Sequence, residues 1–120
     1  KQKRKNIHKE FAKQNQSMAN LPGSDMLIVN PEHYAVALRY DADSMEAPTV
    51  SAKGRNLFAL QLKRAAALHQ IPIFHSPALA RALHRNTPTG QEIGPNEFRS
   101  VADLYLTLHQ RQRASEMPQQ

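Results

Sequence analysis

The spacing of hydrophobic positions changes several times along the chain, and these changes divide it into predicted helices and strands. Segment 4–19 is polar apart from Ile7, Phe11 and Met18, which share one thin helical stripe and predict an exposed, weakly packed helix. A Leu-Pro-Gly sequence ends this helix. The apolar run at 26–29 then predicts a buried strand.

Two further strands are predicted before the middle of the chain. Residues 34–40 alternate strictly between two sets of side chains, as in a strand whose successive residues point to opposite faces. After a polar loop at 41–48, residues 49–52 predict a third strand, which the Lys-Gly pair at 53–54 should close.

Helix-forming residues dominate the second half. Residues 55–70 are rich in Leu, Ala, Lys, Arg and Gln and predict a helix, and residues 71–74 predict a fourth short strand. Ser76 and Pro77 suit the cap and the first turn of another helix.

A last helix is predicted to begin at Pro95, and the polar tail beyond Arg111 is expected to fray. Strands and helices interleave, so we expect an α/β fold: a small four-stranded sheet wrapped by about four helices, with a protruding N-terminal helix. The length of 120 residues suits one modest core. The expected parts are a basic N-terminal linker helix at 1–24, a domain at 25–112 and a polar tail at 113–120.

The net charge of +6 is concentrated at the N-terminus. Residues 1–13 carry six basic side chains against Glu10, a balance of +5, whereas the other residues carry ten basic and nine acidic groups. The predicted body is therefore nearly neutral, and the basicity belongs to an arm. Such an arm suits an anionic membrane surface, at about 1 kcal/mol per Lys or Arg close to it, at least as well as nucleic acid. A solvated helix face is the plain alternative.

The sequence lacks the residues or motifs that several kinds of functional site require. The chain has no cysteine, so a disulfide framework and a thiolate metal site are excluded. No apolar run approaches the roughly 20 residues that span a bilayer, and no signal-peptide pattern is present. The six histidines have no spacing that places two on one helical face, and dinucleotide, P-loop and GxSxG motifs are missing. We expect neither a metal nor a cofactor.

The Asn30–Pro31 junction offers a distinctive reaction. Pro31 has no backbone N–H, so its nitrogen cannot attack the asparagine side chain as the next residue ordinarily does. The reverse attack remains open: the Asn30 side-chain nitrogen attacks the Asn30 carbonyl carbon, expels the Pro31 nitrogen and leaves a succinimide at a new C-terminus. His33 could carry the proton to the leaving nitrogen. An ordinary turn is the plain alternative for an Asn-Pro pair.

A folded protein can lower the activation free energy of this reaction enough for it to occur within minutes. A half-life of weeks corresponds to about 26 kcal/mol and one of about ten minutes to about 21 kcal/mol. The difference between these two barriers is roughly 5 kcal/mol, and holding the reacting atoms in a near-attack geometry can lower a barrier by that amount. A rigid turn between two strands would provide that geometry.

The sequence around this junction resembles that of a known family. Residues 29–33 (Val-Asn-Pro-Glu-His) and 34–41 (Tyr-Ala-Val-Ala-Leu-Arg-Tyr-Asp) are similar to the cleavage loop and next strand of the FlhB/YscU family, the switch proteins of flagellar and injectisome export. The similarity extends over roughly residues 25–110 and leans toward the flagellar branch. It continues through Ala47-Pro48, Ala52-Lys53-Gly54, Ile71-Pro72, Pro77, Leu79-Ala80-Arg81-Ala82-Leu83 and Gly90-Gln91-Glu92-Ile93.

The resemblance implies a fold, a location and a role. The family's domain is a small sheet wrapped by helices, in agreement with the pattern above. Transmembrane helices upstream in a parent protein would place the basic arm at the cytoplasmic face of the bacterial inner membrane. The arm residues expected to meet that anionic surface are Lys1, Lys3, Arg4 and Lys5. Export-gate components and exported substrates would be the partners, and no nucleic acid is expected.

The resemblance also implies a single self-cleavage between Asn30 and Pro31, after which the export machine changes from early to late substrates. The chain would then be no turnover enzyme. The predicted site is Asn30, Pro31, Glu32 and His33, with Asn30 as nucleophile, the Pro31 nitrogen as leaving group and His33 assisting.

Glu32 departs from the family loop, which reads Asn-Pro-Thr-His. Its carboxylate could serve as a base for Asn30, pair with His33, or oppose the oxyanion that forms during attack. The alternative function is a non-cleaving scaffold or a nucleic-acid-binding domain that uses the basic arm.

Overall fold

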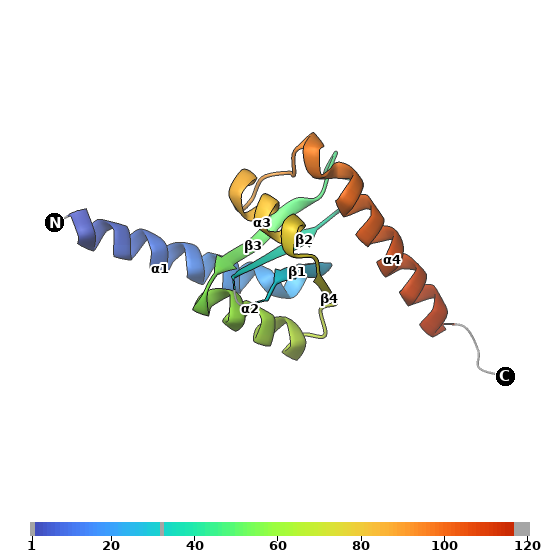
Figure 1. Cartoon of the computed structure of the whole chain (residues 1–120), viewed down its shortest axis with the longest axis horizontal. Helices are drawn as coiled ribbons and strands as arrows, with labels where there is room; N and C mark the ends of the chain where they lie inside the picture. The colour runs from blue at the N-terminus through green and yellow to red at the C-terminus, as the bar shows by residue number, and fades with distance from the viewer. Residues whose placement is uncertain (1, 32, 117–120) are drawn as a thin grey trace.

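A mixed four-stranded sheet lies at the centre of the protein (Figure 1). The computed structural model describes residues 2–31 and 33–116, with side chains from residue 7 onward. The strands are β1 (Met26–Asn30), β2 (Tyr34–Arg39), β3 (Thr49–Arg55) and β4 (Ile73–His75). Their order is β3-β2-β1-β4, with β1 antiparallel to β2, β2 antiparallel to β3, and β1 parallel to β4. The predicted α/β class is confirmed.

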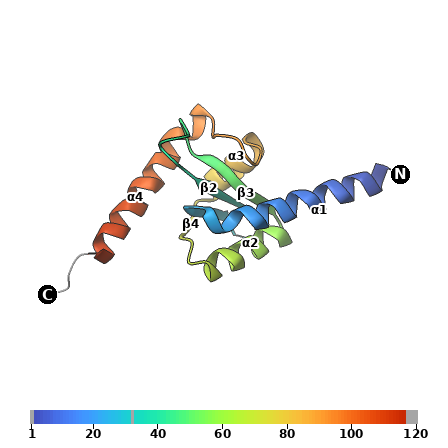
Figure 2. The ribbon, with the colours of Figure 1, turned by 180° about the vertical axis from the view of Figure 1, so that it is seen from behind.

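Four α-helices surround this sheet, as the sequence predicts. They are α1 (Gln2–Asn20), α2 (Leu57–Leu68), α3 (Pro77–Asn86) and α4 (Phe98–Glu116), with short 3-10 turns at Leu21–Gly23 and Pro95–Glu97. The N-terminal part of α1 projects from one end of the molecule and α4 slopes away at the other (Figures 1 and 2). The longest dimension is 64 Å, against 30 and 27 Å for the other two.

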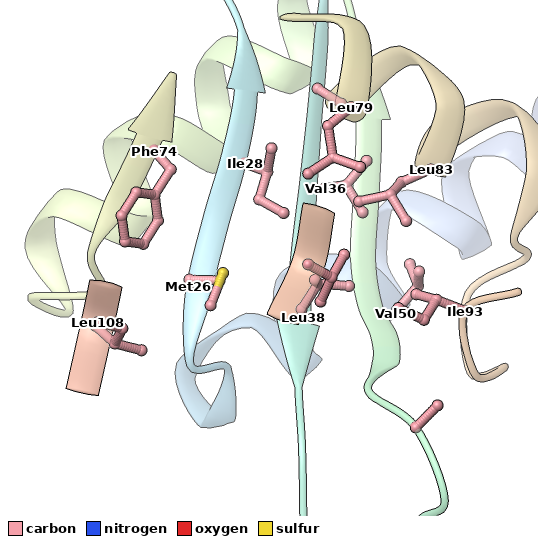
Figure 3. Packing of buried hydrophobic residues seen from close by; sticks show 13 residues of the cluster. Met26, Ile28, Val36, Leu38, Val50, Phe74, Leu79, Leu83, Ile93 and Leu108 are labelled. Carbon is pink, nitrogen blue, oxygen red and sulfur yellow. The ribbon is translucent and has the colours of Figure 1, made fainter. Parts of the chain in front are cut away.

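Both faces of the sheet are buried, because the alternating residues of β1 and β2 feed two separate cores. Met26, Ile28, Val36 and Leu38 face α3 and α4 and interlock with Phe74, Leu79, Leu83 and Leu108 (Figure 3). On the other face, Leu27, Val29, Ala35 and Ala37 pack with Phe58 and Leu62 of α2 and with Leu21 of the 3-10 turn that follows α1. The alternation predicted for 34–40 therefore separates two apolar layers.

The third strand is longer than predicted. It runs through the Lys-Gly pair to Arg55, and α2 begins at Leu57 instead of residue 55. The pairing of β2 with β3 shifts between Ala37 and Leu38, so β3 carries one extra residue there. Because of this bulge, Val50 and Ala52 lie in opposite cores although they are two residues apart. The prediction that the Lys-Gly pair ends the strand is wrong, because Gly54 lies inside β3 and its missing side chain leaves room for α2.

Of two other predicted helix ends, the start of α3 is confirmed in position and the end of α4 needs correction. Helix α3 begins at Pro77 with Ser76 as its N-cap, as predicted, and the Ser76 carbonyl accepts the Ala80 N–H at 2.9 Å, but the Ser76 side chain makes no capping hydrogen bond. Helix α4 continues past Arg111 to Glu116, whereas the sequence predicts a frayed tail there. The Arg111 guanidinium lies 4.9 Å from the centroid of the Phe74 ring, a contact that favours the extended helix.

The outer edge of β3 is covered rather than open. Ser17 of α1 is 2% exposed, and its hydroxyl bonds both to the Lys53 carbonyl (3.3 Å) and to the Lys53 N–H (3.2 Å). Val50 pairs with the backbone of Gly90 and Gln91. The last turns of α1 therefore belong to the packed body, and residue 24 is not a break in packing. No helix of the described residues is long and apolar enough to cross a membrane.

Candidate functional site

The Asn30–Pro31 junction forms the tip of the β1–β2 hairpin. Asn30 is the last residue of β1 and stands opposite Tyr34, the first residue of β2. The His33 N–H donates to the Asn30 carbonyl oxygen at 2.9 Å, which closes a four-residue turn with Pro31 in its second position, where proline is favoured. The predicted role of Glu32 falls on a residue outside those the structure describes.

The turn is held from both sides by neighbouring backbone. The Asn56 N–H donates to the His33 carbonyl at 2.9 Å, and the Ser76 N–H donates to the Val29 carbonyl at 3.0 Å. Asn56 itself has φ 56° and ψ −128°, a region that side-chain-bearing residues rarely occupy. The start of α2 and the start of α3 therefore both fix the position of the Asn30–Pro31 bond.

Asn30 is nearly buried, whereas His33 is exposed. The Asn30 residue is 9% exposed, and its side-chain amide makes no hydrogen bond within residues 2–31 and 33–116. The junction opens on a groove of about 550 Å³ whose walls are Asn30, Pro31 and Tyr34 on one side and the first turns of α2 on the other. Two leucines on the α2 side, Leu57 and Leu60, are 78% and 43% exposed.

One contact of the turn bears on the reaction predicted for the Asn30 carbonyl. The hydrogen bond from the His33 N–H polarises the carbonyl and lies where negative charge would develop on its oxygen. One such donor contributes on the order of 10²–10³ in rate in well-studied acyl-transfer sites.

The predicted site residues and the predicted arm lie apart. Asn30, Pro31 and His33 share one turn, whereas the basic arm is the projecting part of α1. Lys3, Arg4 and Lys5 are in the helix without described side chains, and Lys1 lies outside the described residues. Among those described, no group of three or more metal-binding side chains occurs.

Two residues that fix elements at or near this site were not found from the sequence. Asn56 joins the turn to α2, and its signal was modest: asparagine is enriched at positive φ and follows Gly54 closely. Lys53 ties β3 to the end of α3, donating from Nζ to the carbonyls of His84 (2.9 Å) and Thr87 (3.0 Å). A lysine at this place satisfies carbonyls that a helix end leaves unpaired.

Comparison with known proteins gives consistent matches. The model of a family described as "FlhB HrpN YscU SpaS Family" matches residues 1–108. The flagellar biosynthetic protein FlhB of Salmonella typhimurium is 40% identical over 102 residues, which are 85% of this chain and 27% of that protein. The Bacillus subtilis FlhB is 34% identical over 92 residues, 77% of this chain and 26% of that protein. The chain thus spans about a quarter of the length of these relatives.

Solved structures agree with the sequence matches. The cytoplasmic domain of FlhB from Shewanella putrefaciens superposes with a TM-score of 0.80 at 36% identity and covers 89% of this chain and 85% of that one. A mutated EscU C-terminal domain superposes with a TM-score of 0.71 at 32% identity, covering 75% of this chain and 90% of that one.

Proposed function

The chain belongs to the FlhB, HrpN, YscU and SpaS family, and from this premise we propose that it is the cytoplasmic switch domain of a type III protein export apparatus. The relatives named FlhB favour a flagellar system over an injectisome. In this proposal the domain is not a turnover enzyme. It cleaves itself once, between Asn30 and Pro31, and its altered surface then selects a different class of export substrate.

The observation that carries the proposal is the turn that presents the Asn30 carbonyl. Nδ2 of Asn30 bonds to the carbonyl carbon, the bond from that carbon to the Pro31 nitrogen breaks, and the proton lost by Nδ2 passes to the Pro31 nitrogen. The products are a chain ending in a succinimide at residue 30 and a chain beginning with a free prolyl amine. The His33 N–H supports the charge on the oxygen during attack, because it already donates to that atom at 2.9 Å.

The basic arm is proposed to rest against the anionic cytoplasmic face of the inner membrane. Helix α1 carries the arm away from the sheet, so its lysines can meet a surface without disturbing the turn (Figure 2). Exposed Ile7 and Phe11 would add apolar contact to the electrostatic attraction. Other export-gate components and exported proteins are the proposed partners.

Mass spectrometry of the purified chain tests the cleavage. We expect pieces of 30 and 90 residues in place of the intact 13.5 kDa chain. Asn30→Ala removes the nucleophile and should leave the chain whole. His33→Ala keeps the backbone N–H but removes the imidazole that we propose carries the proton to the Pro31 nitrogen, so it should slow the reaction. An unmodified chain that stays intact after long incubation would refute self-cleavage.

Glu32 can be tested in the same assay, because Glu32→Thr and Glu32→Gln both remove its carboxylate. If that carboxylate serves as a base, both variants cleave more slowly; if it opposes the oxyanion, both cleave faster. Binding to anionic vesicles that is lost on deleting residues 1–13 supports the membrane role. Salt-dependent binding to DNA or RNA through the same arm would favour the alternative of a nucleic-acid-binding domain.

A further inference from the structure

A second groove lies beside the turn, between α1, β3 and the end of α3. Its volume is about 480 Å³, within the range of ligand-binding pockets. Its walls include Lys13 from α1, Lys53 and Arg55 from β3, and His84 from α3. Glu10 is the one carboxylate among the described residues that line it. Two cationic elements, α1 and β3, and an imidazole from α3 therefore line one concavity.

We propose that this basic groove binds an acidic peptide segment of another protein. The three groups that can carry positive charge at neutral pH are Lys13 on α1 and Lys53 and Arg55 on β3. Their spread over two elements suits several carboxylates along a chain better than one small anion. Lys53 uses two of its three N–H donors on the carbonyls of His84 and Thr87, which leaves one for a ligand.

Burial and nearby positive charges in the groove lower the pKa of Lys53 and of His84, as expected where cationic groups lie close together. Burial lowers the pKa of Lys53 below its ordinary value, and the nearby charge of Lys13 lowers it further. Burial also lowers the pKa of His84, with Lys53 and Arg55 acting in the same direction and Glu10 against them. A bound carboxylate would relieve these repulsions and would raise the pKa of His84.

The shape of the groove favours a peptide over a membrane. Ser17, on its wall, is almost fully buried, and Lys53 is held in place by its two carbonyl partners. A lipid surface is flat on this scale and would meet the projecting half of α1 first (Figure 2). A side chain that projects from an extended peptide can reach into the concavity.

The groove also adjoins the Asn30–Pro31 turn. Asn56 lines both this groove and the one on which the junction opens, and its N–H holds the His33 carbonyl. The His84 ring lies 4.9 Å from that of Tyr34, the residue opposite Asn30. A ligand in the basic groove would therefore contact the elements that hold the turn.

Binding of a short capped peptide of consecutive glutamates, measured by calorimetry and by NMR of the histidine rings, tests the proposal. The protein used is the Asn30→Ala chain, so the result does not depend on whether self-cleavage occurs. Lys13→Gln and Arg55→Gln should each weaken binding by about fivefold. Arg99→Gln, a matched loss of charge on α4 outside the groove, should change it less than about twofold.

The NMR titration locates the bound peptide. The pKa of His84 should rise when the peptide binds, whereas the exposed His109 on α4 serves as the ring that should not respond. Equal weakening by Arg99→Gln, or no change at His84, would overturn the proposal. It would also fail if inorganic phosphate bound as tightly as the peptide, or if anionic vesicles alone produced the His84 change.

Discussion

Single residues in this protein carry constraints that the sequence pattern only partly reveals. The Asn30–Pro31 junction was located from chemistry and resemblance, because only an asparagine before a proline offers that particular attack. Gly54, in contrast, was interpreted as a strand terminator. It lies inside β3 opposite Ala35, where its missing side chain leaves room for α2. A sequence signal for glycine does not distinguish a turn from a close approach between elements.

Gly54→Ala should destabilise the fold by about 1–3 kcal/mol, the usual cost of forcing a methyl group into a filled space. A Cβ at this position would collide with the Phe58 ring and come within 3.1 Å of Leu62 Cδ1. Urea unfolding of the two chains measures the difference. Gly23→Ala is the control, since a Cβ there meets nothing within 4 Å. Equal stability of the Gly54→Ala and unmodified chains would mean that α2 shifts without cost.

His84 should make the fold less stable as the solution becomes acidic. Burial, with Lys53 and Arg55, lowers its pKa in the folded state below the value of about 6.5 expected for the unfolded chain. The unfolded state therefore binds more protons below about pH 7, and stability falls from about pH 7.5 to about pH 5.5.

His84→Gln should reduce the part of this fall that His84 causes, as measured by chemical denaturation at both pH values. His109→Gln, at an exposed position on α4, should leave the pH dependence as it is. The same slope for the His84→Gln and unmodified chains would contradict the assignment.

At the scale of elements, the order and type of the helices and strands were predictable and several of their ends were not. Apolar spacing identified β1, β2 and α2 because each buries apolar side chains, and it identified α1 from a stripe of which Ile7 and Phe11 remain exposed. The end of β3 depends on a bulge and on contact with α2, and the end of α4 on the stacking of Arg111 over Phe74. The β2–β3 pairing and the Arg111–Phe74 contact join residues far apart in sequence, so no local pattern records them.

The attachment of α1 to the sheet should depend on Ser17. Ser17→Ala removes the hydroxyl that bonds both backbone groups of Lys53, at an expected cost of about 1 kcal/mol. Hydrogen exchange of the Lys53 amide should become faster, because its partner on the covered edge of β3 is lost. Ser115→Ala is a fair comparison, since that hydroxyl bonds one carbonyl on the exposed side of α4. Unchanged exchange at Lys53 would show that α1 is held by other contacts.

Across the whole molecule, β1 belongs to the first piece of a cleaved chain but lies in the middle of the sheet. It pairs with β2 along its full length and with β4 at three positions, so it is bonded on both sides by the second piece. Leu21, Leu27 and Val29 are also buried in the core that α2 covers. Breaking one peptide bond at the hairpin tip removes none of these contacts.

We therefore expect the two pieces of a cleaved chain to elute together in gel filtration and to separate only in denaturant. Folding of the cleaved form becomes an association of two chains, so its melting temperature should rise with protein concentration, while that of uncleaved Asn30→Ala should not. Leu27→Ala, which removes buried contacts of the first piece, should lower the melting temperature of both forms but release the first piece only from the cleaved one. Elution of a free 30-residue piece from the otherwise unmodified cleaved chain under native conditions would show that the strand pairing is too weak to replace the broken bond. The altered surface would then arise by loss of β1, whereas retention of both pieces confines the change to the freed ends of the turn at Asn30 and Pro31.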